Sequence, residues 1–247
     1  GAAVRDIDAH AGRVKFLVRS TGHVVSATER DVKLWDGRTL APFMTIDNLD
    51  LLSPSEPGAP PRRQNHRQVS AVAINGPSSR LAYAIRSPVP RIQLWDVEGE
   101  AREDSIQNLE ALVTALAFSP SGEFLAAGMS DGTAILWRLR DLTPYARDRK
   151  PRPQIKARRP REDWVERPPS RTLSLSAHKK PITALAFTGD GSRLVTASED
   201  RTAKLWDVES GEQTLSFLRG HSDSITSVSV RDKGGRLITG SLDGSAL

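Results

Sequence analysis

Apolar and polar residues alternate in short runs that recur along the whole chain. Period-two runs of four to seven residues, bounded by Gly, Asp and Ser, are typical of β-strands rather than helices. The clearest runs are Val14–Val18, Val69–Ile74, Val113–Phe118, Ile182–Phe187 and Ile225–Val230. Their starts lie 55, 44, 69 and 43 residues apart. A recurring period of this length predicts a repeat architecture with five units.

Two of the four intervals are longer than the basic unit. If that unit has 43 or 44 residues, the longer intervals carry insertions of roughly 12 and 26 residues, which surface loops tolerate. The predicted units span about residues 9–46, 66–107, 108–177, 178–220 and 221–247, with flexible insertions at 47–65 and 141–170.

The fourth unit shows the internal pattern most clearly. Its runs are Ile182–Phe187, Leu194–Ser198, Thr202–Asp207 and Gln213–Leu218, and turn residues separate them. This spacing predicts a four-stranded antiparallel sheet. Such a sheet has two apolar faces that it cannot bury alone, so neighbouring units are expected to stack face to face.

The dipeptide Leu-Trp ends the third run of four units, at Trp35, Trp95, Trp137 and Trp206, and Gly220-His221 precedes an inner strand. With these motifs the chain resembles the WD40-repeat β-propeller family, over nearly everything except the two insertions. The resemblance implies an all-β propeller of four-stranded antiparallel blades.

The resemblance also implies that hydrogen bonds among a His, a Ser or Thr, an Asp and a Trp knit each blade together. The fourth unit has the complete set, which is His178, Thr196, Asp200 and Trp206. The fifth has His221, Thr239 and Asp243, and its Trp would fall about two residues beyond Leu247. We expect these residues to be structural rather than catalytic.

The first and second units depart from this pattern. The first has His10, Ser26 and Trp35, but its turn Glu29–Asp31 is one residue short, which leaves open which acid serves. The second has Trp95, while His66 lies one residue too close to its strand and Pro88-Val89-Pro90 replaces the acidic turn.

The third unit has Asp131 and Trp137 but no His, and Ala127 stands where a hydroxyl is expected. A buried Asp or His without its partner costs about 1 to 3 kcal/mol. The incomplete units are therefore expected to be the looser ones.

Composition restricts the picture further. Only 5% of the 247 residues are aromatic and 38% are hydrophobic, so we expect a core of Val, Leu, Ile and Ala with Trp at the blade seams. The chain has no Cys, which excludes disulfides and thiolate zinc sites. No apolar stretch is long enough to span a membrane. A soluble cytoplasmic protein is the expectation.

The ends of the sequence suggest an excerpt of a larger propeller. Propellers of this family commonly have seven blades and close when an N-terminal strand completes the last sheet, and Val4–Asp8 resembles such a strand. We expect an incomplete ring with two blades missing; a tight five-bladed ring is the alternative.

The second insertion concentrates the positive charge. Between Arg138 and Arg171 twelve basic residues oppose five acidic ones, a net +7, so the rest of the chain sums to −2 against a total of +5. The candidate contacts in this basic loop are Arg147, Arg149, Lys150, Arg152, Lys156, Arg158, Arg159, Arg161 and Trp164. A solvated insertion, contact with an acidic protein or membrane surface, and nucleic-acid binding are the alternatives, the last being the least favoured.

Motifs for chemistry are missing from the sequence. No His pair has metal-ligand spacing, no Ser lies in a nucleophile elbow, and no Gly-rich loop with a Lys precedes a helix. We therefore expect no catalytic residue, cofactor, metal or small-molecule substrate, and no enzyme activity.

The leading hypothesis is a protein-interaction scaffold that binds peptides or proteins on the narrow face, the propeller face that carries the residues beside the structural His and Asp. The candidate contacts on this face are Lys179, Lys180, Glu199, Ser222, Asp223, Leu242 and Ser130. The alternative is a sensory or regulatory module appended to an enzyme such as a protein kinase or peptidase.

Overall fold

The structure of the chain is a computed structural model, and it describes residues 10–46, 68–77, 79–86, 89–99, 101–139, 172–216, 220–231 and 236–247. Several sequence-based predictions lie outside these residues. They concern the outer strand Val4–Asp8, His66, and the insertions at 47–65 and 141–170.

The described residues form antiparallel sheets, which we call blades one to five in chain order. Blade one comprises β1 (Phe16–Arg19), β2 (His23–Ala27), β3 (Val32–Asp36) and β4 (Pro42–Ile46). Blade two comprises β5 (Gln68–Asn75), β6 (Arg80–Arg86), β7 (Arg91–Asp96) and β8 (Ala101–Ile106). Blade three comprises β9 (Val113–Phe118), β10 (Phe124–Met129), β11 (Ala134–Arg138) and β12 (Thr172–Leu175). Blade four comprises β13 (Ile182–Phe187), β14 (Arg193–Ser198), β15 (Ala203–Asp207) and β16 (Gln213–Ser216). Blade five comprises β17 (Ile225–Arg231) and β18 (Arg236–Ser241), extended by a bridge between Gly240 and Ala246.

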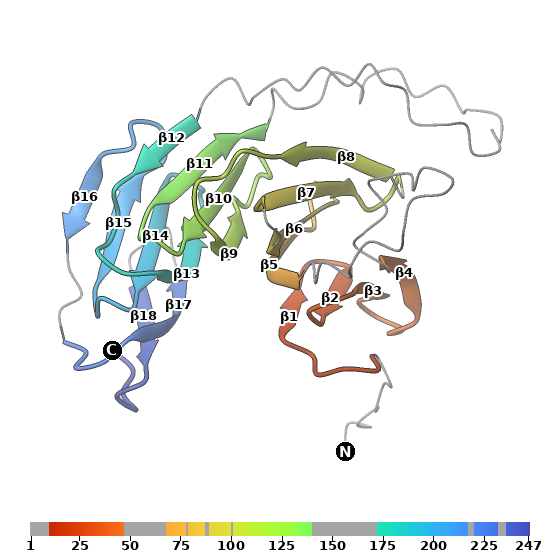
Figure 1. Cartoon of the computed structure of the whole chain (residues 1–247), viewed down its shortest axis with the longest axis horizontal. Coiled ribbons are helices and arrows are strands. Elements are labelled where there is room, and N and C mark those ends of the chain that lie inside the picture. The colour runs from red at the N-terminus through yellow and green to blue at the C-terminus, as the bar shows by residue number, and fades with distance from the viewer. Residues whose placement is uncertain are drawn as a thin grey trace, which may run out of the picture.

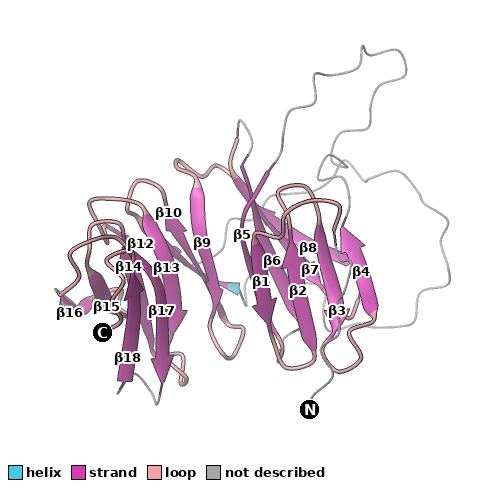
Figure 2. Ribbon diagram, turned by 90° about the horizontal axis from the view of Figure 1, so that it is seen from below, coloured by secondary structure: helices cyan, strands magenta, loops and turns pink. Residues whose placement is uncertain are grey.

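The blades follow one another around an open arc, with blades one and five at its two ends (Figure 1). The inner strands β5, β9, β13 and β17 are successive neighbours, and β1 neighbours β5. Figure 2 shows the sheets standing side by side with their strands roughly parallel to the arc's axis. The predicted all-β architecture of four-stranded antiparallel blades is confirmed, and the ring is not closed.

Apolar side chains fill each junction between neighbouring blades. One cluster joins blades one and two around Leu34 and Leu81, and a second joins blades two and three around Leu94 and Leu125. Two further clusters join blades three to four and four to five. Because an isolated sheet cannot bury both faces, this stacking supplies the apolar burial that stabilises each blade.

Tryptophan lies at the seams, as the composition predicts. Trp95, Trp137 and Trp206 each pack in the cluster that joins their own blade to the preceding one. The rest of the buried core consists mainly of Val, Leu, Ile and Ala. Within the described ranges no helix is long and apolar enough to cross a lipid bilayer.

Candidate functional site

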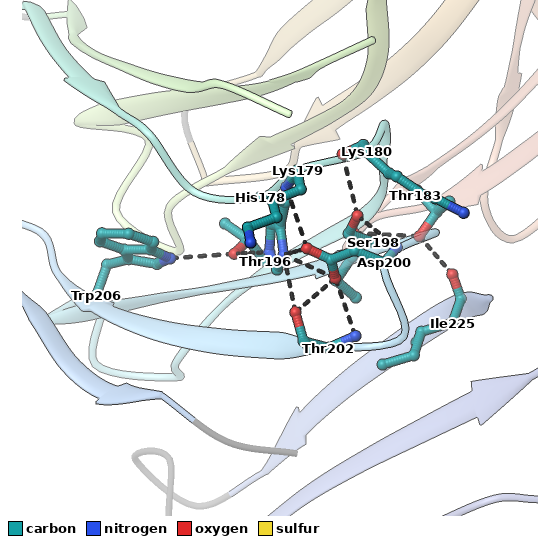
Figure 3. Close-up of polar contacts among 11 residues, drawn as sticks. His178, Lys179, Lys180, Thr183, Thr196, Ser198, Asp200, Thr202, Trp206 and Ile225 are labelled. Carbon is teal, nitrogen blue, oxygen red and sulfur yellow. Dashed lines mark hydrogen bonds and ion pairs between the residues drawn. The ribbon is translucent and has the colours of Figure 1, made fainter. Parts of the chain in front are cut away.

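Blade four contains a continuous polar link through its interior (Figure 3). The His178 ring lies between two partners: its Nδ1 is 3.0 Å from Asp200 Oδ2, and its Nε2 is 2.7 Å from Thr196 Oγ1. The indole of Trp206 donates to the same Thr196 hydroxyl at 3.0 Å. All four residues that the family resemblance assigns to this blade therefore lie in contact.

The Asp200 carboxylate is saturated with donors. Besides His178, it accepts hydrogen bonds from the Thr202 hydroxyl at 2.5 Å, the Thr202 amide at 3.0 Å and the Lys179 amide at 3.2 Å. These bonds fix the loop before β13 to the turn between β14 and β15. Two loops of the narrow face are thus held as one rigid unit (Figure 3).

Burial and hydrogen bonding shift the proton affinities of this pair. Burial lowers the pKa of His178, and the nearby Asp200 offsets this only in part. Burial alone would raise the pKa of Asp200, but the hydrogen bond from Thr202 and the attraction of His178 outweigh it and lower the pKa. At neutral pH the link is a neutral imidazole beside an ionised carboxylate.

Blade five repeats the arrangement without a Trp. His221 Nδ1 lies 3.1 Å from Asp243 Oδ2, and its Nε2 lies 2.8 Å from Thr239 Oγ1. Asp243 also accepts from the Ser245 hydroxyl, the main reason its pKa lies well below the usual value. Leu247 pairs with Thr239 through two backbone hydrogen bonds.

Blade one settles which acid serves in its shortened turn. His10 Nδ1 lies 2.8 Å from Asp31 Oδ2 and its Nε2 lies 2.7 Å from Ser26 Oγ, which also accepts from the Trp35 indole at 2.7 Å. Glu29 pairs instead with Lys15. The missing residue in the turn therefore leaves Asp31 in contact with the His.

Blades two and three are built differently. In blade two the Trp95 indole donates to the hydroxyl of Tyr83 at 3.3 Å, a residue that the sequence analysis did not single out. In blade three Asp131 is exposed and accepts only the Thr133 amide at 2.9 Å, while Ala127 is fully buried and offers Trp137 no hydroxyl.

A second polar link joins neighbouring blades, and sequence reasoning missed it. The second residue of each inner strand from β5 to β17 is skipped in the pairing register, as a β-bulge. In β13 this residue is Thr183, whose hydroxyl contacts Ala197 O in its own blade at 3.1 Å and Ile225 O of blade five at 2.5 Å. Thr114 makes the same two contacts, to Gly128 O and to Ile182 O of blade four.

The signal for this link was present in the sequence. Ser or Thr stands at the second position of the runs that begin at residues 69, 113, 182 and 225. A recurring hydroxyl inside an apolar strand indicates a specific hydrogen bond, because an unpaired buried hydroxyl is costly.

The predicted partner contacts are arranged on the loops that these links hold. Lys179, Lys180, Glu199, Ser222, Asp223 and Leu242 are exposed. Ser130 is half-buried, and its hydroxyl accepts the Leu112 amide at 3.2 Å, so it supports its own turn. The basic loop with Arg147, Arg158 and Trp164 lies outside the described residues, and its role stays a prediction. Within the part of the chain that the structure describes, no group of His, Asp and Glu could hold a metal ion.

Comparison with known proteins places this geometry in a family. A model of the WD domain, G-beta repeat, matches residues 104–138, 169–207 and 212–247. The chain is 33% identical over 157 residues to a protein of chromatin assembly factor 1 from Gallus gallus, a match that covers 60% of this chain and 26% of that protein.

Two further relatives match in the same way. Mitochondrial division protein 1 of Schizosaccharomyces pombe is 29% identical over 157 residues, covering 61% of this chain and 22% of that protein. A lissencephaly-1 homolog of Branchiostoma floridae is 50% identical over 60 residues, covering 24% of this chain and 14% of that protein. The chain thus spans about a quarter or less of the length of these relatives.

Proposed function

This chain belongs to the WD40-repeat family, and we propose that it acts as a non-catalytic scaffold that binds peptide or protein partners on its narrow face. The observation that carries the proposal is the anchoring of exposed loops to the blade interiors. In blades four and five, the amides of Lys179 and Ser222 are held by Asp200 and Asp243, at 3.2 and 2.8 Å.

Such anchoring suits recognition because it lowers the conformational entropy lost on binding. The exposed side chains of Lys179, Lys180 and Ser222 extend from backbones that are already ordered. Each blade then contributes a few fixed side chains to one composite surface, as function in repeat proteins commonly requires.

The proposal includes the absence of catalysis and a cytoplasmic location. The titratable groups with the most distinctive surroundings, His178 and Asp200, already bond to each other and to Thr196 and Thr202. A general acid or base must reach a substrate proton, and these groups are engaged in holding the blade.

Site-specific photocrosslinking tests the proposed face. A photoreactive amino acid replaces Ser222 or Lys180 on the narrow face, and matched controls replace Glu212 on the opposite face and Leu215 on the outer strand β16. We expect partner adducts from the first two positions only. Adducts only at Glu212 or Leu215 would move the binding surface elsewhere and overturn the proposal.

A further inference from the structure

One backbone position differs between blades that are otherwise equivalent. The residue after the turn Asp is Gly132 in blade three and Gly244 in blade five, with φ of 90° and 83°. In blade four it is Arg201, with φ of 70°. The left-handed region is unfavourable for residues with a Cβ, so blade four places a strained Arg where its neighbours have Gly.

The glycine has a visible purpose at the junction of blades three and four. A Cβ at Gly132 would lie 2.2 Å from His178 O and 3.0 Å from Lys180 O. The close approach lets the His178 amide donate to Gly132 O at 2.9 Å. Glycine therefore closes this junction on the narrow face.

Arg201 leaves the next junction open. The equivalent bond, from the His221 amide to Arg201 O, is not formed. In its place lies a pocket of about 340 Å³, lined by Asp200, Arg201, Thr202, Gly220 and His221. The substitution of Arg for Gly thus coincides with a recess between two blades.

The groups left unsatisfied around this pocket are donors. Within the described ranges, neither the guanidinium of the exposed Arg201 nor the amide of His221 has a protein acceptor. The carboxylates of Asp200 and Asp243, by contrast, are already saturated by hydroxyl and amide donors. A ligand that supplies acceptor oxygens complements what remains free.

We propose that the pocket between blades four and five binds the carboxylate of an Asp or Glu side chain in a protein partner, with the Arg201 guanidinium as the anchoring group. The inference rests on the proposed scaffold function and specifies its partner chemistry. A guanidinium offers paired N–H donors that match a carboxylate, and the His221 amide provides a further donor.

The pocket volume and the surrounding charges fit one side chain rather than a free small molecule. A volume of about 340 Å³ lies at the lower end of the range for ligand pockets, roughly 300–1,000 Å³. The charges of Lys179, Lys180 and Arg201 are nearly balanced by Glu199, Asp200, Asp223 and Asp243. Recognition therefore depends on short-range hydrogen bonds more than on long-range attraction.

Fluorescence anisotropy with a short labelled Glu-rich peptide tests the inference. We expect the peptide to bind the wild type, and its counterpart with Gln in place of Glu to bind at least about tenfold more weakly, because hydrogen bonds to charged groups carry the contact. Arg201→Ala and Arg201→Lys should each weaken binding about tenfold or more, since Lys cannot form the paired bonds. Arg193→Ala, which removes an exposed Arg at the other end of β14, is the matched control and should bind normally.

Arg201→Gly separates the binding role from a structural one. This variant should lose the peptide as Arg201→Ala does, while its melting temperature stays equal to or above that of the wild type because the left-handed strain is relieved. A lower melting temperature would mean that Arg201 supports the fold, and would overturn the inference.

Two other results would also overturn it. One is failure of the wild type to bind the Glu-rich peptide, and the other is equal binding of the Glu and Gln peptides or of the Arg201 variants. If crosslinks from Ser222 still capture a partner in that case, the carboxylate site fails while the scaffold proposal stands.

Discussion

Blades three and four have the same strand order and register but opposite interiors. Where blade four has His178 and Thr196, blade three has Leu109 and Ala127, both buried. The acid that bonds to the His in blade four has an exposed counterpart in blade three, Asp131. The two blades therefore hold the same sheet by different means, one with a polar network and the other with apolar contacts.

The difference teaches that the polar link is replaceable as a unit. Removing one partner of a buried hydrogen bond leaves the other unsatisfied, whereas replacing both by apolar groups can be nearly neutral. Leu109 and Ala127 are such a double replacement. The expectation that incomplete blades are looser therefore does not follow for blade three, whose core cluster includes both Leu109 and Trp137.

The largest effect should come from the residue that both interiors share. Trp206→Ala and Trp137→Ala should each lower the free energy of unfolding by about 3 to 5 kcal/mol, because both indoles are buried at a seam. Denaturant titration measures both changes. Leu215→Ala on the exposed strand β16 is the control and should shift the unfolding free energy by about 0.5 kcal/mol or less. A small effect of Trp137→Ala alone would show that blade three does not depend on its seam.

The next effect converts one interior into the other. His178→Leu and Thr196→Ala should each cost about 1 to 3 kcal/mol, because each leaves a buried partner unsatisfied. The double variant reproduces the pair found in blade three and should cost less than the sum of the single changes. Costs that simply add would break the comparison, because they would show that the two residues act independently.

The sequence predicted the architecture because its signals are periodic. Strand runs, turns and the four Leu-Trp dipeptides repeat, so an irregularity in one unit is compensated by its neighbours. It also predicted the His, Thr, Asp and Trp of blade four, on the strength of the family resemblance. These residues lie at fixed separations along the chain, and His178 and Asp200 meet because the strands between them form a regular hairpin.

Other features could not be predicted because they depend on distances across blades. Whether Asp31 or Glu29 meets His10 is decided by how the short turn folds, and Tyr83 reaches Trp95 only through the pairing of β6 with β7. The left-handed backbone at Arg201 and the pocket beside it arise from the spacing of blades four and five. A single sequence gives no measure of that spacing.

Acid should distinguish the two interiors more gently. The pKa of His178 is lowered by burial, so the unfolded chain takes up a proton near pH 6.5 while the folded chain does so only at lower pH. Stability from this group is complete above pH 6.5 and is lost as the pH falls through the folded pKa. The pKa of Asp200 is also lowered, so its contribution is present above 3.8 and is lost as the pH falls below that value.

Unfolding free energies between pH 7.5 and 4.5 measure this loss. We expect the His178→Leu/Thr196→Ala variant to have a flatter profile than the wild type, because it lacks the ring that titrates. Equal slopes would show that His178 does not titrate in this range, and that the polar interior carries no sensitivity to acid that the apolar one lacks.

The smallest effect concerns the hydroxyl link that blades three and four have in common. Thr114→Val and Thr183→Val should each cost about 0.5 to 1.5 kcal/mol, because each hydroxyl contacts two carbonyl oxygens, one of them in the next blade. Thr226→Val is the matched control, since its exposed hydroxyl contacts only Gly240 O, at 3.2 Å, within the described residues. We expect its cost to be smaller than that of the other two, measured by denaturant midpoints at constant slope. If all three substitutions cost the same, the contact with the next blade contributes nothing, and apolar packing alone joins the blades whichever interior they have.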